Sequence, residues 1–286
     1  MATAMFIFGT LGLFVRHISL DSGELALYRA ILAVGLIGIW LIITKNKISI
    51  LQIKRELPLL FVSGAAMGIN WILLFQSYKY TTVSMATLSY YFAPVLVTLI
   101  CPLFFHEKTT VGQKLCFLMS TIGLVLIIGT GGISGNRQNI IGILFGLGAA
   151  VFYATVIVLN KFIKNVTGLH RTFLQFIAAI VVLLPYVLIT SGIHVTALDG
   201  KGWVNLLLVG LIHTGITYCL YFSALKDLPG QETAILSYID PLVAVAVSVL
   251  ILGEYMSFWQ AAGGALILGF TLWNEWKENS NDIVGK

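Results

Sequence analysis

The stretch LSYIDPLVAVAVSVLILGE at residues 236–254 decides the fold, because a weaker copy, SYYFAPVLVTLICPLFFHE, lies at residues 89–107. The two copies share a tyrosine, a proline and a glutamate at a constant separation of 147 residues, measured from Pro94 to Pro241. Proline and glutamate are scarce in this chain, so these matches carry more weight than shared leucines. Nearby Leu-Ser-Tyr triplets match at a separation of 148 residues instead, so two alignments of the copies, which differ by one residue, stay open.

The composition around these copies is that of a membrane protein. Of the 286 residues, 58% are hydrophobic and only 10% are charged, whereas an average soluble domain has about 25% charged residues. Long apolar runs are expected to be helices, because a backbone in lipid must satisfy its own hydrogen bonds. They also lack the alternating polarity of membrane-barrel strands. We predict ten spans, at residues 2–16, 24–44, 57–78, 84–105, 112–130, 139–160, 169–190, 202–224, 231–252 and 258–275.

The distribution of lysine and arginine predicts the orientation. With the N-terminus inside the cell, 12 of the 17 basic residues fall on the inner side and 4 on the outer side, while Arg29 lies within a span. Cytoplasmic loops of membrane proteins carry such an excess of positive charge. We therefore predict a multi-pass protein of the cell membrane with both termini in the cytoplasm.

Each copy of the repeat contains five predicted spans. An odd number of spans turns the second copy upside down, which is the inverted-repeat architecture of secondary transporters with a substrate site near the bilayer midplane. The predicted fold class is all-α integral membrane, with ten transmembrane helices as two inverted five-helix repeats. The repeats are expected at residues 1–131 and 138–276, and residues 277–286 are expected to form a cytoplasmic tail.

The second copy and the residues after it resemble a known family. LSYIDPLVA at residues 236–244, LGE at 252–254 and GGALILG at 263–269 look like the signature of the drug/metabolite transporter superfamily, EamA-like branch. The first half carries a weaker version, in which His106 replaces the usual glycine before Glu107. The resemblance covers essentially the whole chain. It implies a basket of ten helices around a central cavity and the transport of amino acids, related metabolites or drugs, often outward, but it does not identify the substrate.

Asp240 is the first candidate site residue. It lies about ten residues into the ninth predicted span, directly before Pro241. A carboxylate at that depth costs about 2.5–3.5 kcal/mol, so it must be protonated, paired or in contact with water. Because proline cannot donate a backbone hydrogen bond, a carbonyl is freed one turn earlier, near Ser237. Two interpretations stay open: Asp240 couples transport to protons or binds substrate, or it is a protonated partner of the freed carbonyl.

His213 and a set of mid-span side chains complete the predicted substrate-binding site. His213 lies midway along the eighth span, and its ordinary pKa of about 6.5 suits a proton carrier. The other interpretation is a buried neutral histidine with a hydroxyl partner. Trp71 is the one tryptophan far from a span end, where an interfacial belt normally holds this residue. The predicted set is Asn70, Trp71, Tyr91, His213, Tyr218, Tyr238 and Asp240, placed around one axis by the repeat.

Three further charged residues admit structural interpretations. Arg29 opens the second span, where we expect its side chain to extend to the outer surface; the alternative is that it holds a substrate carboxylate. Glu107 and Glu254 close matched spans, each just before a predicted helix start, where an acid is favourable. We interpret both glutamates as structural hinges.

These features favour a secondary transporter that moves amino acids or similar small metabolites by alternating access, as an exporter. An exporter of cationic drugs or amines is the alternative. No phosphate-binding loop suggests ATP hydrolysis, and we expect a small-molecule substrate and membrane lipid as the partners, with no nucleic acid, cofactor or metal. A membrane enzyme would cluster its polar residues at an interface, and a channel would show charged rings or a carbonyl filter; the sequence favours neither.

Overall fold

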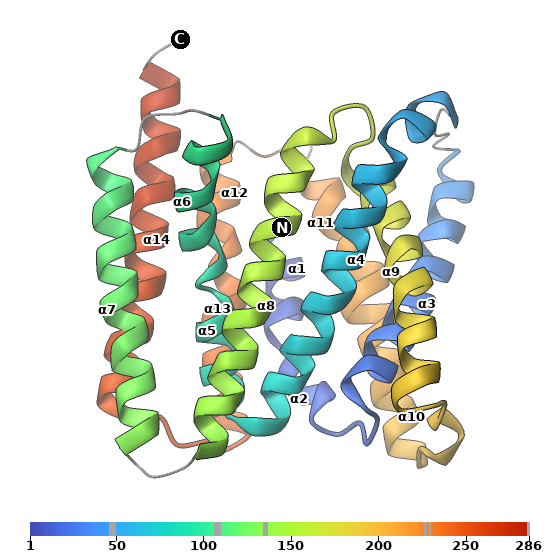
Figure 1. Cartoon of the computed structure of the whole chain (residues 1–286), viewed down its shortest axis with the longest axis horizontal. Helices are drawn as coiled ribbons and strands as arrows, with labels where there is room; N and C mark the ends of the chain where they lie inside the picture. The colour runs from blue at the N-terminus through green and yellow to red at the C-terminus, as the bar shows by residue number, and fades with distance from the viewer. Residues whose placement is uncertain (46–49, 106–109, 134–136, 226–227, 229, 285–286) are drawn as a thin grey trace.

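Figure 1 shows the computed structural model of the chain as a bundle of helices that run roughly side by side. The structure describes residues 1–45, 50–105, 110–133, 137–225, 228 and 230–284. Within these ranges every regular element is a helix and no strand is present. The α-helices are α1 (Ala2–Gly9), α2 (Leu11–Val15), α3 (Ser22–Ile43), α4 (Ile50–Tyr80), α5 (Val83–Tyr90), α6 (Ala93–Phe105), α7 (Val111–Ile133), α8 (Arg137–Phe162), α9 (Gly168–Thr190), α10 (Gly200–Leu207), α11 (Thr217–Leu225), α12 (Gly230–Ser237), α13 (Ile239–Ala246) and α14 (Phe258–Val284). Three short elements complete the order: the 3₁₀ turn η1 (Val195–Ala197) and the π-helical segments η2 (Leu208–Ile216) and η3 (Val247–Ile251).

The helices are long and apolar enough for a membrane protein. Seven of the described helical segments reach the length and hydropathy needed to cross a bilayer, and two apolar segments, Ala2–Val15 and Ile235–Ile251, are shorter. Each of the ten predicted spans coincides with helical residues of the structure. The helical, membrane-type fold class predicted from the hydropathy pattern is therefore confirmed.

Two matched helices break just before their prolines. The run that contains Pro94 is interrupted at Tyr91 and Phe92, between α5 and α6, and the run that contains Pro241 is interrupted at Tyr238, between α12 and α13. A proline ring removes one backbone donor and clashes with the carbonyl four residues earlier, which explains both breaks. One pair of helix starts also recurs at the separation found in the sequence, since α14 begins 147 residues after α7.

Glycines allow the closest helix contacts. A Cβ atom added to Gly123 of α7 would lie 2.5 Å from the carbonyl oxygen of Gly263 in α14, and the reverse distance is the same. Small residues of this kind let membrane helices approach backbone to backbone. Figure 1 shows α7 and α14 side by side along most of their length. Gly9 does the same for α1, since a Cβ atom there would lie 2.5 Å from the carbonyl oxygen of Asp240 in α13.

Candidate functional site

The broken helices bring Tyr91 and Asp240 together. The Tyr91 hydroxyl donates a hydrogen bond to Asp240 Oδ2 at 2.5 Å. Tyr91 lies at the break after α5, and Asp240 lies in the first turn of α13, so one hydrogen bond joins the two matched helices. Both side chains are half-buried. The pairing supplies a partner for a carboxyl group that lipid alone would penalise.

Further tyrosines surround this pair. The Tyr90 ring lies 5.9 Å from the Tyr91 ring and 5.2 Å from the ring of Tyr153 on α8. Asp240 interacts electrostatically with Tyr90, Tyr153 and Tyr218. We call Tyr90, Tyr91, Tyr153, Tyr218 and Asp240 the tyrosine cluster. It combines one carboxyl group with hydroxyls and aromatic faces from α5, α8, α11 and α13, so it can bind a ligand that is partly polar and partly apolar.

An aromatic chain extends the cluster toward α4. Phe176 of α9 makes edge-on contacts with both Trp71 and Tyr218, at ring-centre distances of 5.0 and 5.3 Å. Tyr218 also contacts Phe8 of α1 at 5.2 Å. Edge-on aromatic pairs at such distances are favourable beyond their buried area. Trp71 and Tyr218, two residues of the predicted set, are therefore linked through Phe176.

Arg29 lies inside the bundle and does not reach the surface of the protein. Its side chain is buried, and Nε donates to the Thr214 hydroxyl at 2.6 Å. The guanidinium carbon lies 4.7 Å from the centre of the Trp71 ring and 5.5 Å from that of Phe75. The predicted extension of Arg29 to the outer surface is wrong, because these aromatic faces and the Thr214 hydroxyl hold the cation inside the protein.

His213 is bonded at both ring nitrogens. Nδ1 lies 3.1 Å from the carbonyl oxygen of Leu208, and Nε2 lies 3.0 Å from the Thr10 hydroxyl. The wider turns of the π-helix η2 allow the first contact, which spans five residues. Phe14 packs on the imidazole ring at 4.7 Å. This geometry matches the expected histidine with a hydroxyl partner, and it places His213 at the junction of α1 and η2.

Two members of the predicted set lie apart from the tyrosine cluster. The Asn70 amide nitrogen donates to the carbonyl oxygen of Ala149 at 2.6 Å, so it fastens α4 to α8. Tyr238 is buried and interacts electrostatically with Glu275 and Cys116, on the side of α14 and α7. The repeat makes Tyr91 and Tyr238 equivalent in sequence, but the two rings have different surroundings.

One end of the bundle is tied by a chain of charged and hydroxyl groups. Arg16 Nη1 lies 2.7 Å from Glu254 Oε1, and Glu254 Oε2 accepts the backbone N–H of Val83 at 2.8 Å. Ser248 donates to the same carboxylate and is itself bonded to Ser84. We call Arg16, Val83, Ser84, Ser248 and Glu254 the end clip.

The end clip gives Glu254 structural contacts beyond those expected at a helix start. Its carboxylate binds groups from the other half of the chain, whereas the start of α14 is capped by reciprocal bonds between Ser257 and Gln260. The matched Glu107 lies outside the described residues. The expectation for Glu107 therefore stays a prediction.

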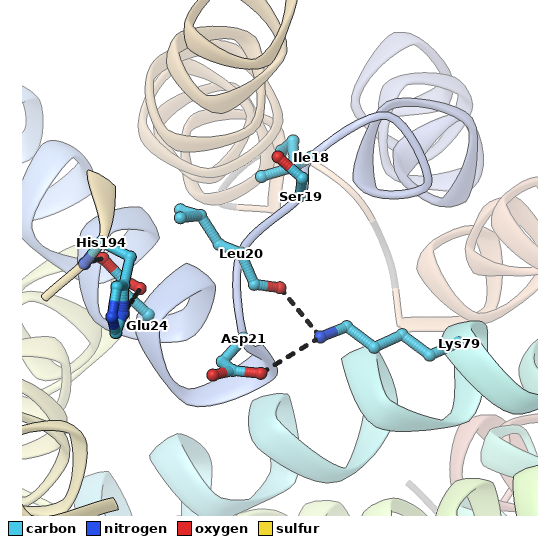
Figure 2. A pocket seen from close by; sticks show the side chains of 7 residues that line it. All are labelled: Ile18, Ser19, Leu20, Asp21, Glu24, Lys79 and His194. Atoms are coloured by element: carbon cyan, nitrogen blue, oxygen red, sulfur yellow. Dashed lines mark hydrogen bonds and ion pairs between the residues drawn. The ribbon is translucent and has the colours of Figure 1, made fainter. Parts of the chain in front are cut away.

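A separate pocket of about 410 Å³ lies near the same end, where α3 begins. Figure 2 shows Lys79 reaching the Leu20 carbonyl oxygen at 2.8 Å, with Asp21 at 3.8 Å. On the other side of the pocket, the buried Glu24 accepts the backbone N–H of His194 at 2.7 Å. None of the seven predicted site residues lines this pocket. Its polar groups serve to fasten the chain before α3 to α4 and to the loop after α9.

Sequence reasoning missed several residues of the site. Tyr90 and Tyr153 join the tyrosine cluster, although neither belongs to the predicted set. Phe176 and Phe8 had no distinguishing signal, since phenylalanine is common in every span. Among the described residues, no group of three or more His, Cys, Asp or Glu side chains is arranged to hold a metal ion.

Long apolar helices that break beside buried polar groups define a class: multi-pass membrane proteins of the transporter type. Comparison with known proteins agrees. The family model of the EamA-like transporter family matches residues 1–129 and again residues 140–274. The chain therefore belongs to the EamA-like transporter family, and it is a membrane transporter.

Individual relatives support this assignment. The uncharacterized transporter YxxF of Bacillus subtilis (strain 168) is 32% identical over 269 residues, which cover 93% of this chain and 85% of that protein. An uncharacterized transporter of Archaeoglobus fulgidus is 28% identical over 272 residues, covering 94% and 93% of the two chains. A solved crystal structure with 19% identity superposes with a TM-score of 0.64 over 94% of this chain and 93% of its own, which shows that the fold is shared.

Proposed function

We propose that this protein is a secondary transporter of the cell membrane that moves amino acids or similar small metabolites outward by alternating access. In this proposal ten spans form two inverted five-helix repeats, and both termini are cytoplasmic. The hydrogen bond between Tyr91 and Asp240 carries the proposal. It places an ionisable group where two broken helices meet, which is the arrangement of substrate and coupling-ion sites in secondary transporters.

The recurrence of the helix breaks supports the two-repeat architecture. Both breaks precede a proline at a matched position, and α14 begins 147 residues after α7. Two similar halves can rock about a shared site and open it to one side at a time. The end clip is consistent with this motion, because Arg16, Val83 and Ser84 come from one half and Ser248 and Glu254 from the other.

Proton coupling through Asp240 forms part of the proposal. A carboxyl group that is bonded to a phenol in one state and exposed to water in the other changes its tendency to ionise between the two states. Such a change lets one group bind a proton on one side of the membrane and release it on the other. Asp240 is the acid of the tyrosine cluster, whereas His213 is bonded at both nitrogens.

A second substrate class, cationic drugs or amines, is favoured by one observation. Asp240 supplies a carboxyl group bonded to Tyr91, whose ring contacts Tyr90, and cations bind well to such a combination of negative charge and aromatic faces. The buried cation Arg29, in contact with Trp71, favours substrates that also carry a negative group.

Flux measurements in sealed vesicles test the proposed function. Purified protein in proteoliposomes is assayed for uptake of radiolabelled L-amino acids, with and without an unlabelled excess of the same compound inside. A carrier gives saturable uptake that the internal compound accelerates. Flux that rises linearly with concentration and ignores the internal compound would contradict the proposal in favour of a channel, and chemical conversion of the compound would indicate an enzyme.

A further inference from the structure

The guanidinium of Arg29 is buried and largely without partners. The side chain is 4% exposed, and its one hydrogen bond among the described residues runs from Nε to the Thr214 hydroxyl. Nη1 is buried with no hydrogen-bond partner. The ion pairs of the described residues involve Arg16, Lys79 and His194, and none includes Arg29.

The burial of a cation with so few partners carries a large free-energy cost. Burying a charge without a partner costs several kcal/mol, and arginine remains protonated rather than escape that cost by losing its proton. Contacts with the faces of Trp71 and Phe75 offset only part of that cost. These ring contacts satisfy none of the N–H groups of Arg29, because the N–H groups point outward in the plane of the guanidinium and the rings lie against its face. The free edge of Arg29 is therefore suited to an anion that the protein itself does not supply.

The surroundings of Arg29 indicate where that anion would lie. Arg29 interacts electrostatically with Tyr78, Tyr90 and Tyr218, and the same three tyrosines interact with Asp240. The cation and the acid thus share these three phenols as electrostatic partners, and neither is in an ion pair with the other among the described residues. Thr214, held by its own bond to the carbonyl oxygen of Val209 at 2.8 Å, fixes the Nε edge and leaves the opposite edge free.

We infer that Arg29 binds the carboxylate of the transported molecule, which the proposed function makes an amino acid. The substrate class is then a zwitterionic α-amino acid, and amines without a carboxylate are excluded. A planar guanidinium matches a carboxylate with two parallel hydrogen bonds. This inference rests on the proposed transport function and narrows its substrate class.

The test begins with unmodified protein, so it does not depend on a variant that folds. Thermal stability in detergent is measured with L-phenylalanine and L-leucine, with their carboxamides and with the amines that lack the carboxyl group. A ligand stabilises the folded state in proportion to its binding. We expect an amino acid to bind at least about tenfold more tightly than its amide or amine, because a charge-assisted bond to a buried partner is lost.

The second part uses Arg29→Gln, with Arg137→Gln at the exposed start of α8 as the matched control. Arg29→Gln should bind the amino acids about 10- to 100-fold more weakly and should no longer distinguish them from the amides. Arg137→Gln should behave as the unmodified protein. If the variant does not fold, the comparison of acid, amide and amine on the unmodified protein decides alone.

The outcomes separate this inference from the proposed function. Equal binding of amides or amines, tighter binding of a phosphate ester without a carboxylate, or no binding of either amino acid would overturn the role of Arg29. Saturable transport of amines that lack a carboxylate would also overturn the role of Arg29, but it would leave the proposed carrier function intact. Carboxylate-dependent binding without any flux would support Arg29 as the anchor and contradict transport instead.

Discussion

Arg16 and Glu254 form an ion pair with a nitrogen–oxygen distance of 2.7 Å across 238 positions of the chain. Arg16 directly follows α2, and Glu254 lies between η3 and α14. The Glu254 side chain is 9% exposed, so solvent screens this pair less than an ordinary surface ion pair. The pair ties together segments that must separate if this end of the bundle opens.

The first prediction concerns this tie. Glu254→Gln removes the charge, and the lost charge-assisted bonds should shift the balance toward the open state by about 1–3 kcal/mol. A single cysteine at the buried Thr87 of α5, in a background without Cys101, Cys116 and Cys219, reports the opening through its rate of maleimide labelling. We expect labelling about tenfold faster with Glu254→Gln.

The control for this experiment is Asp21→Asn, which removes one exposed ion pair and leaves the bond from Lys79 to the Leu20 carbonyl oxygen in place. Lys79 and Asp21 lie 3.8 Å apart, and their side chains are 41% and 63% exposed, so this pair should contribute little. An equal increase in labelling with both variants would show that general loosening, rather than the end clip, limits access.

The second prediction concerns Asp240 and its hydrogen bond to Tyr91. Asp240→Asn keeps the size of the side chain and an oxygen acceptor for Tyr91, but it cannot ionise. Exchange of internal for external substrate should persist, while accumulation driven by a pH gradient should be lost. Both modes are measured in proteoliposomes at several pH values.

Two results would change the role of Asp240. Unchanged gradient-driven accumulation in Asp240→Asn would remove Asp240 from proton coupling and leave His213 as the remaining candidate. Loss of both modes in a folded variant would indicate that Asp240 binds the substrate directly.

The third prediction concerns the contact between α7 and α14. Gly123→Val adds side-chain atoms where a Cβ already lies 2.5 Å from the carbonyl oxygen of Gly263, so it should destabilise the protein by about 1–3 kcal/mol. Gly129→Val on the same helix has open space around it and is the matched control. Thermal unfolding in detergent is the measurement. A melting temperature that falls equally in both variants would show that valine is unfavourable on α7 for reasons other than this contact.

The fourth prediction concerns orientation in the membrane. Single cysteines at Lys164, before α9, and at Lys201, in the first turn of α10, occupy exposed positions at opposite predicted sides. In intact cells an impermeant maleimide should label the cysteine at position 201 and not the one at position 164. Labelling only at position 164 would reverse the predicted orientation.

Much of the fold could be predicted because its physical causes are local. The length of each apolar run, the cost of an unsatisfied backbone in lipid and the effect of proline act within a single helix. The breaks beside Pro94 and Pro241 are examples of a local effect, although Pro58 and Pro185 lie inside α4 and α9 without breaking them. The meeting of Tyr91 and Asp240 is consistent with the repeat, which assigned both residues to one axis.

The rest of the site depends on contacts between distant segments. Hydropathy places Arg29 near a helix end, but only Trp71 on α4 and Thr214 in η2 determine that its side chain turns inward. Tyr238 matches Tyr91 in sequence, yet its neighbours α7 and α14 give it a different environment. Glu56 likewise accepts three backbone N–H groups from residues 164–166, a contact across more than 100 positions that no local pattern reveals.

The inequality of the two halves has a thermodynamic consequence. The repeat places Ala93 opposite Asp240, so the tyrosine cluster contains one carboxyl group rather than two. A single acid limits the stoichiometry at this position to one proton per transport cycle. A proton that moves down a gradient of one pH unit releases about 1.4 kcal/mol, which sustains about a tenfold concentration ratio of a substrate whose movement carries no net charge. In the proposed mechanism, the presence of a carboxyl group in only one of the two halves would therefore set the steepest substrate gradient that the pH difference alone could maintain.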